Sequence, residues 1–204
     1  MEFAMIIDTH VHICPKEVRE NKEKLLDDEP EFAAIYRNPK SRLVGADELI
    51  EKMDEEGVDK SVVFGFPWRK EENFRLNNDY VLECASKYPN RLIPFCCFSL
   101  DSSSFEKEIK RCLDMGVRGI GEIAFYTRDM EGEERKILSK VALICEDANI
   151  PILLHTNEPV GHFYPGKSPM TLKSLYLLIK DNPNTKWILA HLGGGLPFFG
   201  YLKR

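Results

Sequence analysis

The feature that most constrains the fold is a regular alternation of short apolar runs with amphipathic segments. The apolar runs are rich in Val, Ile, Leu and Phe and recur at 3–7, 61–66, 92–98, 117–123, 150–154 and 186–190. Nearly continuous apolar runs of this length are typical of strands buried on both faces of a parallel sheet. From the second run onward, each interval is long enough for one strand and one crossover helix.

Helical patterns fill these intervals. We expect helices over 46–56, 77–87, 104–115 and 133–148, and a further helix that Ser168 caps, Pro169 opens and Asp181 ends. Strict alternation of strand and helix predicts an α/β fold with a parallel sheet, either a closed barrel or an open doubly wound sheet. Because no G-x-G-x-x-G motif follows the first run, the dinucleotide-binding form of the open sheet is disfavoured. The barrel is the favoured interpretation.

One segment interrupts the regular alternation of strands and helices. Residues 13–46 separate the first strand from its helix and are dense in charged side chains. A long insertion after a barrel strand lies on the active-site face, where it can act as a lid. A solvated helical segment without a role in catalysis is the alternative. The sequence as a whole predicts a single domain over residues 1–204, with this insertion after its first strand.

Composition and charge exclude several classes of partner. The net charge is −5 and there is no block of Lys and Arg, so the sequence predicts a small-molecule substrate and no binding of nucleic acid. It contains no apolar stretch of membrane-spanning length, and its first residues lack the basic start of a signal peptide, so we expect a cytoplasmic protein. The six cysteines form no C-x-x-C pair and are expected to be buried thiols. A homo-oligomer is possible on this sequence.

Histidines stand at the ends of three predicted strands. His10 and His12 close the first strand, His155 ends the fifth and His191 ends the sixth. Residues i and i+2 of a strand share a face with their Cα atoms roughly 6.5–7 Å apart, and imidazoles at that spacing can converge on one metal ion. A single histidine is usually a half-buried side chain without such a role. Because the strand ends of a barrel meet at one rim, the four together favour a metal centre.

A carboxylate joins this pattern. Glu122 ends the fourth predicted strand, where it either enters the barrel or contacts a helix. A buried carboxylate without a partner is strongly disfavoured. We therefore expect Glu122 to contact a metal or the substrate, or to pair with Arg118 or another base.

Loops that follow the strands supply candidate substrate contacts. Glu158, His162 and Lys167 follow the fifth strand, where His162 could assist proton transfer and Lys167 could hold an anionic group. Trp68 and Arg69 follow the second strand and could also face the substrate. Exposed loop residues need no function, so the alternative for each of them is a solvated side chain.

Four motifs in order carry a resemblance to a known family. They are Asp8-Thr9-His10-Val11-His12, Gly121-Glu122-Ile123, the stretch from His155 to His162, and Ala190-His191-Leu192-Gly193-Gly194. Together they resemble the amidohydrolase superfamily, and in particular its amidohydrolase-2 branch, which includes enzymes similar to aminocarboxymuconate-semialdehyde decarboxylase. The resemblance implies a (β/α)8 TIM barrel of the metal-dependent hydrolase type with one or two divalent ions. By position it implies the metal ligands His10, His12, His155 and His191, with Glu122 as a fourth or bridging ligand.

The sequence departs from the family pattern at one point. Family members carry an aspartate at the end of strand eight, and no segment after His191 reads as a seventh or eighth strand. We therefore expect a barrel that lacks its last one or two βα units in this chain.

The predicted activity is hydrolysis of an amide, ester or lactone-like bond of a small molecule by a metal-activated water. The metal is expected to be Zn²⁺, with Mn²⁺ or Fe²⁺ as alternatives. His191, His162 and Glu122 are the candidate catalytic residues. Non-oxidative decarboxylation by the same ligand set is the second interpretation, and a non-catalytic metal-binding fragment is the third.

Overall fold

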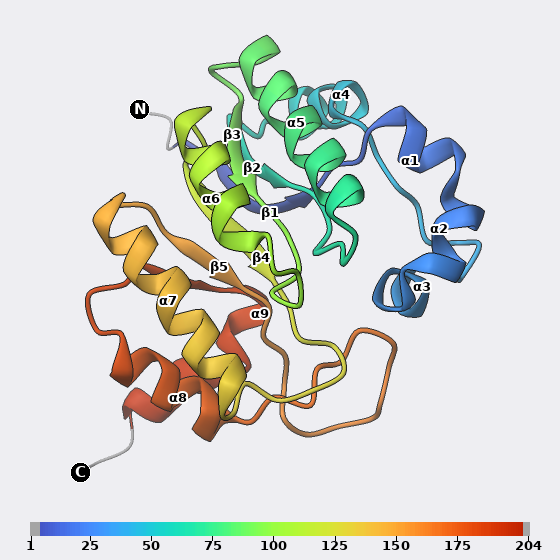
Figure 1. Cartoon of the computed structure of the whole chain (residues 1–204). Coiled ribbons are helices and arrows are strands. Elements are labelled where there is room, and N and C mark those ends of the chain that lie inside the picture. Colours follow the sequence, from blue (N-terminus) through green and yellow to red (C-terminus); the bar gives the residue numbers. More distant parts are fainter. Residues whose placement is uncertain (1–4, 202–204) are drawn as a thin grey trace. The chain divides into compact units, whose positions relative to one another are not determined.

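A computed structural model describes residues 5–201 of the chain, which form two compact units. The first unit extends to Arg118 and the second begins at Gly119. Figure 1 shows both units and labels most of their helices and strands. Within residues 5–201, none of the helices has the length and apolar character needed to cross a membrane.

The first unit is a parallel sheet with helices between its strands. Its elements are β1 (Ile7–His12), α1 (Lys16–Glu20), α2 (Lys22–Asp28), α3 (Pro30–Tyr36), α4 (Ala46–Glu56), β2 (Lys60–Phe64), α5 (Glu71–Lys87), β3 (Leu92–Cys96) and α6 (Phe105–Asp114). β2 pairs in parallel with β1 and with β3, so that His12 lies beside Phe64 and Ser61 beside Leu92. Buried side chains from β2, α4 and α5, among them Val63, form one core cluster with Ile13.

The second unit repeats the same plan. Its elements are β4 (Gly119–Ile123), α7 (Glu133–Asp147), β5 (Ile152–Leu154), α8 (Leu172–Asp181), β6 (Trp187–Leu189), α9 (Ala190–Gly193) and the 3-10 helix η1 (Leu196–Tyr201). β5 pairs in parallel with β4 and with β6, so that Ile152 lies beside Ile120 and Leu154 beside Leu189. The predicted alternation of strand and helix is confirmed in both units.

Helix boundaries depend on local signals. α4 covers the predicted residues because Gly57 ends it in the left-handed conformation, with φ at 70°. The prediction for α8 was wrong at its start. Thr171, rather than Ser168, caps this helix and forms a capping box with Ser174. The Ser168 N–H instead donates to Oδ1 of Asn157 at 2.8 Å, which fixes this residue in the preceding loop.

The first strand also differs from the prediction. The apolar run 3–7 lies partly outside the described residues, and the strand itself is Ile7–His12. Pairing with β2 continues as far as His12. His10 and His12 therefore close this strand, as predicted. They still share one face, because side chains at i and i+2 point the same way.

The insertion over residues 13–46 folds into α1, α2 and α3 and is firmly attached. Glu29, between α2 and α3, is almost completely buried. Its carboxylate accepts hydrogen bonds from the backbone N–H groups of Arg69 and Lys70 and from Nδ2 of Asn73. Those groups lie at the start of α5, where a carboxylate is favoured by unpaired N–H groups and by the helix dipole.

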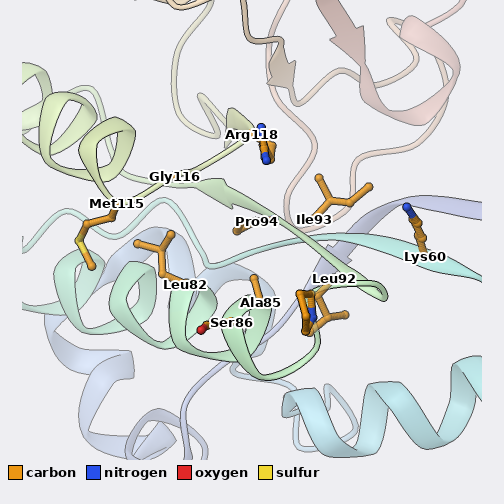
Figure 2. Close-up of a pocket in the computed structure, with 11 residues that line it drawn as sticks. Lys60, Leu82, Ala85, Ser86, Leu92, Ile93, Pro94, Met115, Gly116 and Arg118 are labelled. Atoms are coloured by element: carbon orange, nitrogen blue, oxygen red, sulfur yellow. The ribbon is translucent and has the colours of Figure 1, made fainter.

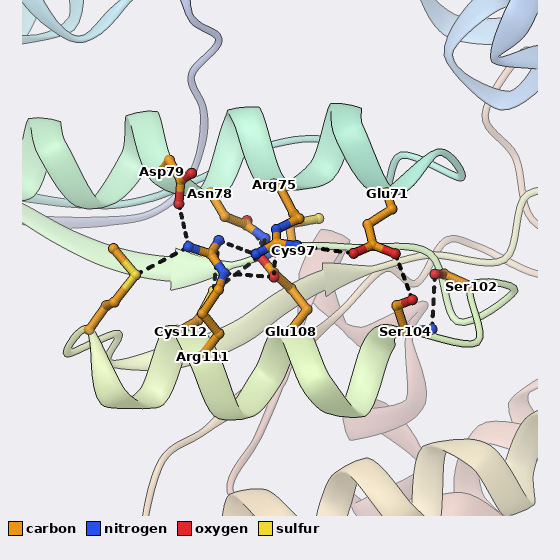
Figure 3. A network of polar contacts seen from close by, with 11 residues as sticks. Glu71, Arg75, Asn78, Asp79, Cys97, Ser102, Ser104, Glu108, Arg111 and Cys112 are labelled. Atoms are coloured by element: carbon orange, nitrogen blue, oxygen red, sulfur yellow. Dashed lines mark hydrogen bonds and ion pairs between the residues drawn. The ribbon is translucent and has the colours of Figure 1, made fainter.

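A polar network joins α5 to α6 and to Cys97, the residue after β3 (Figure 3). Glu108 is buried, and its carboxylate accepts from Nε and Nη2 of Arg111 at 2.9 and 2.7 Å and from Nδ2 of Asn78 at 2.9 Å. Oδ1 of Asn78 in turn accepts from the backbone N–H of Cys97. Burial raises the pKa of Glu108, but the hydrogen bonds from Arg111 and Asn78 outweigh it and hold the pKa below its ordinary value.

The six cysteines are free and buried, as predicted. Burial raises the pKa of Cys14 in the first unit and of Cys145 in the second to about 12. At neutral pH these thiols stay protonated and pack as small apolar groups.

Candidate metal centre

Three potential metal ligands meet within the second unit. Each of Glu122, His155 and His191 offers one ligand atom, and these atoms all lie within 4.8 Å of one another. Nδ1 of His155 is 3.0 Å from Oε1 of Glu122, and Nε2 of His191 is 3.7 Å from the same oxygen. The two imidazole rings are 4.9 Å apart between centroids.

The ends of neighbouring strands position these three side chains. Glu122 is in β4, His155 directly follows β5 and His191 follows β6. Gly121 has a φ of 129°, and a Cβ on this residue would overlap the carbonyl oxygen of Leu153 in β5. Only glycine therefore allows the backbone before Glu122 to approach β5 this closely.

The backbone at His191 is strained. His191 and Leu192 have φ values of 51° and 58°, a region that costs non-glycine residues roughly 1–2 kcal/mol each. Gly193, Gly194 and Gly195 continue with positive φ at no such cost. The hydroxyl of Thr156 donates to the carbonyl of Ala190, which ties this turn to the chain after β5.

Burial and charge make the cluster suited to a cation. The Glu122 side chain is 2% exposed and its carboxylate faces two imidazoles. A desolvated carboxylate is stabilised by a positive charge beside it. One carboxylate and two imidazoles form a ligand set suited to Zn²⁺ and other first-row divalent ions.

The other two candidate ligands belong to the first unit. The rings of His10 and His12 are 5.4 Å apart and both contact the ring of Phe64. Nδ1 of His12 is 2.8 Å from the carbonyl oxygen of Gly65. Because a carbonyl only accepts, Nδ1 of His12 carries the proton and Nε2 is the nitrogen left to bind a metal.

A cavity of about 360 Å³ lies in the second unit between the loops that follow β4 and β5. Its lining residues are Tyr126, Thr127, Glu158, Pro159, Phe163, Lys167, Ser168, Pro169 and Met170. The rings of Tyr126 and His155 are 5.1 Å apart, so the cavity adjoins the cluster. Tyr126 and Phe163 were not predicted as site residues. Their place in loops after strands was the only available signal.

The predicted substrate contacts occupy different environments. Glu158 and Lys167 line this cavity but pair with each other, with Nζ 3.1 Å from Oε1. His162 is exposed, and its ring lies edge-on to Tyr164. Arg69 is also exposed.

Trp68 lies in the interior of the first unit. Its side chain is 0% exposed, packs against Phe32 and Phe66, and donates from Nε1 to Oδ1 of Asn77 at 3.0 Å. This burial argues against the direct substrate contact predicted for it, because the indole already has packing and hydrogen-bonding partners.

A second cavity, of about 500 Å³, is shown in Figure 2. It lies in the first unit at the amino-terminal ends of β2 and β3, and α5 contributes Leu82, Ala85 and Ser86 to its wall. In parallel α/β barrels the chemistry takes place at the carboxyl ends of the strands. Within the first unit, this cavity therefore lies at the end of β2 opposite to Phe64, beside which His12 lies.

Comparison with known families agrees with these observations. Residues 7–201 match the family profile described as amidohydrolase. No curated protein sequence gives a significant match.

Several solved structures are similar to the chain at low identity. One is 5-carboxyvanillate decarboxylase from Novosphingobium aromaticivorans DSM 12444 complexed with manganese and 4-hydroxy-3-methoxy-5-nitrobenzoic acid. It has a TM-score of 0.70 and 17% identity, and the match covers 97% of this chain and 68% of that one. The 5-carboxyvanillate decarboxylase from Sphingomonas paucimobilis has a TM-score of 0.67 and 15% identity, with 96% and 70% covered. The 4-oxalomesaconate hydratase from Rhodopseudomonas palustris has a TM-score of 0.58 and 19% identity, with 96% and 66% covered.

These likenesses confirm the predicted α/β fold of the amidohydrolase type. The chain spans about two thirds of the length of these proteins.

Proposed function

The chain belongs to the amidohydrolase family, and from this premise we propose that it provides the metal centre of an enzyme that acts on a small molecule. The proposed reaction is hydrolysis of an amide, ester or lactone-like bond. The observation that carries the proposal is the cluster of Glu122, His155 and His191, whose ligand atoms lie within 4.8 Å of one another around the buried carboxylate of Glu122.

The ligand set supports Zn²⁺ as the first choice of metal, with Mn²⁺ and Fe²⁺ as alternatives. The manganese bound to 5-carboxyvanillate decarboxylase supports the second choice. A divalent ion in such a site supplies a Lewis acid and lowers the pKa of a bound water toward neutrality. We further propose that His10 and His12 complete the ligand set.

The side chains of the cluster have different tasks in this proposal. Glu122 and His155 are nearly buried and bind the ion. His191 is half exposed, so its Nε2 can bind the ion or exchange a proton with the substrate. Tyr126 and Phe163, from the cavity beside the cluster, would contact the apolar part of the substrate.

Non-oxidative decarboxylation is the second candidate reaction. It is supported by the likeness to two 5-carboxyvanillate decarboxylases, at TM-scores of 0.70 and 0.67. Release of CO₂ from aromatic carboxylic acids, measured against hydrolysis of a panel of amides and lactones, separates the two reactions. Turnover of neither panel by metal-loaded protein would favour a chain that binds metal without catalysis.

The metal site itself is tested by measuring bound zinc after dialysis. We expect wild-type protein to retain zinc and His155→Ala to lose it, because this substitution removes a ligand. His162→Ala is the matched control and should retain zinc, since His162 is an exposed histidine of the following loop and is not a member of the cluster. Equal zinc content in wild type and His155→Ala would overturn the ligand assignment. His12→Ala tests the proposed contribution of the first unit in the same way.

A further inference from the structure

We infer that the loop after β5 determines which ring nitrogen of His155 faces the metal, and that Glu158 is the positioning residue that holds this loop. The inference rests on the proposed metal centre and concerns only residues of the second unit.

His155 has a different partner at each ring nitrogen. Nε2 is 3.2 Å from the carbonyl oxygen of Gly166, whereas Nδ1 is 3.0 Å from Oε1 of Glu122. A carbonyl oxygen only accepts hydrogen bonds, so Nε2 must carry the proton. Nδ1 is then the nitrogen that can bind a metal next to Glu122. A hydrogen bond from the opposite nitrogen of a ligating histidine fixes the orientation and tautomer of its ring.

The Gly166 carbonyl is held by a tight turn. The backbone N–H of Lys167 donates to the carbonyl of Tyr164 at 3.1 Å, which closes a four-residue turn through Pro165 and Gly166. Proline followed by glycine is the preferred central pair of a type II turn, in which the third residue needs a positive φ. Gly166 has a φ of 88°.

Glu158 connects both ends of this turn. Its Oε2 accepts from the hydroxyl of Tyr164 at 2.9 Å, and its Oε1 accepts from Nζ of Lys167 at 3.1 Å. Lys167 also donates to the carbonyl oxygens of Val160 and His162, at 2.9 and 3.3 Å. The contacts with Lys167 and Tyr164 lower the pKa of Glu158, so its carboxylate is charged at neutral pH.

These contacts change the interpretation of Lys167. Its side chain is only 11% exposed, and its ammonium group donates to three acceptors within the loop. An ammonium group has three hydrogens, so all three are in use. The geometry therefore argues against the predicted contact between Lys167 and an anionic substrate. Glu158 and Lys167 instead hold the turn, the turn holds the Gly166 carbonyl, and this carbonyl orients His155.

The experiment compares Glu158→Ala with wild type in two measurements. The first is the affinity for Zn²⁺, measured by competition with a chelator. Loss of a residue that orients a metal ligand costs about 10–100-fold in affinity. We expect a loss near 10-fold, because Glu158 acts on His155 through the turn and not directly. Glu133→Gln is the matched control, since it breaks an exposed pair with Lys136 on α7, and it should leave the affinity unchanged.

The second measurement is the ¹⁵N spectrum of the His155 ring. Zinc-loaded wild type should show a protonated Nε2, and in Glu158→Ala the signal of this proton should broaden or disappear. Tyr164→Phe, which removes a single contact to Glu158, should have a smaller effect on both measurements. A metal-bound Nε2 in wild type would overturn the inference, as would unchanged affinity in Glu158→Ala.

The two proposals can fail separately. If wild-type protein binds no zinc, the proposed metal centre fails. The Nε2 proton can then be compared in metal-free wild type and Glu158→Ala, and an unchanged signal would overturn the role of Glu158.

Discussion

Glu108 in the first unit and Glu122 in the second are both buried carboxylates, with side chains that are 3% and 2% exposed. Their partners differ. Glu108 accepts hydrogen bonds from an arginine, which is always charged, and from an amide. Glu122 faces two imidazoles, which are neutral or charged according to their surroundings. A permanent cation makes the first carboxylate a structural element, whereas imidazoles leave the second open to binding a metal.

The two units also differ in backbone strain. Within residues 5–201, the non-glycine residues with positive φ are Asn149, His191 and Leu192, and all three belong to the second unit. Strained conformations persist where the surrounding structure enforces them, and they are concentrated at functional sites. The second unit thus combines the ligand cluster with local strain. The first unit satisfies its buried carboxylates Glu29 and Glu108 with hydrogen bonds from backbone N–H groups and from Arg111.

The largest expected effect contrasts the two carboxylates. Glu108→Ala should lower the free energy of unfolding by about 3 kcal/mol, because it leaves the guanidinium of Arg111 and the amide of Asn78 without their acceptor. Glu122→Gln should cost metal-free protein less than about 1 kcal/mol, because a neutral amide removes the cost of burying a charge. Urea unfolding of both variants measures the difference. Equal losses would remove the distinction between a structural and a functional carboxylate.

Added metal should stabilise the protein through Glu122 and not through Glu108. At a free Zn²⁺ concentration about 100 times the Kd, the free energy of unfolding should rise by about 2.7 kcal/mol in wild type. The same increase is expected in Glu108→Gln, whereas Glu122→Gln should respond weakly. Thermal unfolding with and without Zn²⁺ tests this, and Ca²⁺ serves as a control ion because it prefers oxygen ligands. A full response in Glu122→Gln would contradict the proposal.

Acid should weaken the first unit through Glu108. The pKa of Glu108 is held below its ordinary value of 4.5 in the folded protein. A lowered folded-state pKa contributes stability that is present above the ordinary value and is lost as the pH falls through the folded-state value. The difference in unfolding free energy between wild type and Glu108→Gln should be constant near neutral pH and shrink below pH 4.5. A difference that grew with acidification would show that the sign is wrong.

The smallest expected effect concerns backbone strain in the second unit. Leu192 is 81% exposed and has a φ of 58°, so Leu192→Gly should raise the free energy of unfolding by about 0.5 kcal/mol. Leu143 is 60% exposed within α7, and Leu143→Gly should lower it by about 1 kcal/mol. Opposite signs for the same exchange would confirm that the strain is local to the turn after β6.

Sequence patterns predicted the alternation of strands and helices and the grouping of Glu122, His155 and His191. The alternation is confirmed and the three side chains lie together, because strand runs and strand ends are local features whose placement follows from the fold class. Their role as metal ligands stays a prediction. The start of α8 was missed, since Ser168 and Pro169 satisfy the rule for a helix start equally well. A hydrogen bond from the Ser168 N–H to Asn157, at the other end of the loop after β5, keeps Ser168 out of the helix.

Side-chain roles in the loops were harder to predict. Glu158 and Lys167 are suitable residue types for a substrate site, and only their mutual contact shows that they hold the loop. Trp68 occupies a loop position typical of a pocket residue but is covered by Phe32 of the insertion. Such contacts depend on how loops fold onto each other, which no periodic pattern records.

The attachment of Glu29 to the start of α5 determines how the insertion can be altered. Its buried carboxylate accepts hydrogen bonds from backbone N–H groups that would otherwise have no acceptor. The segment from Lys16 to Tyr36 therefore cannot be deleted or exchanged as an independent module. A graft from a relative would have to supply an acceptor at the same point. Amide hydrogens of Arg69 and Lys70 should accordingly exchange with solvent as slowly as those of the neighbouring strands. The insertion is then a rigidly attached part of the first unit and does not open and close as a lid would.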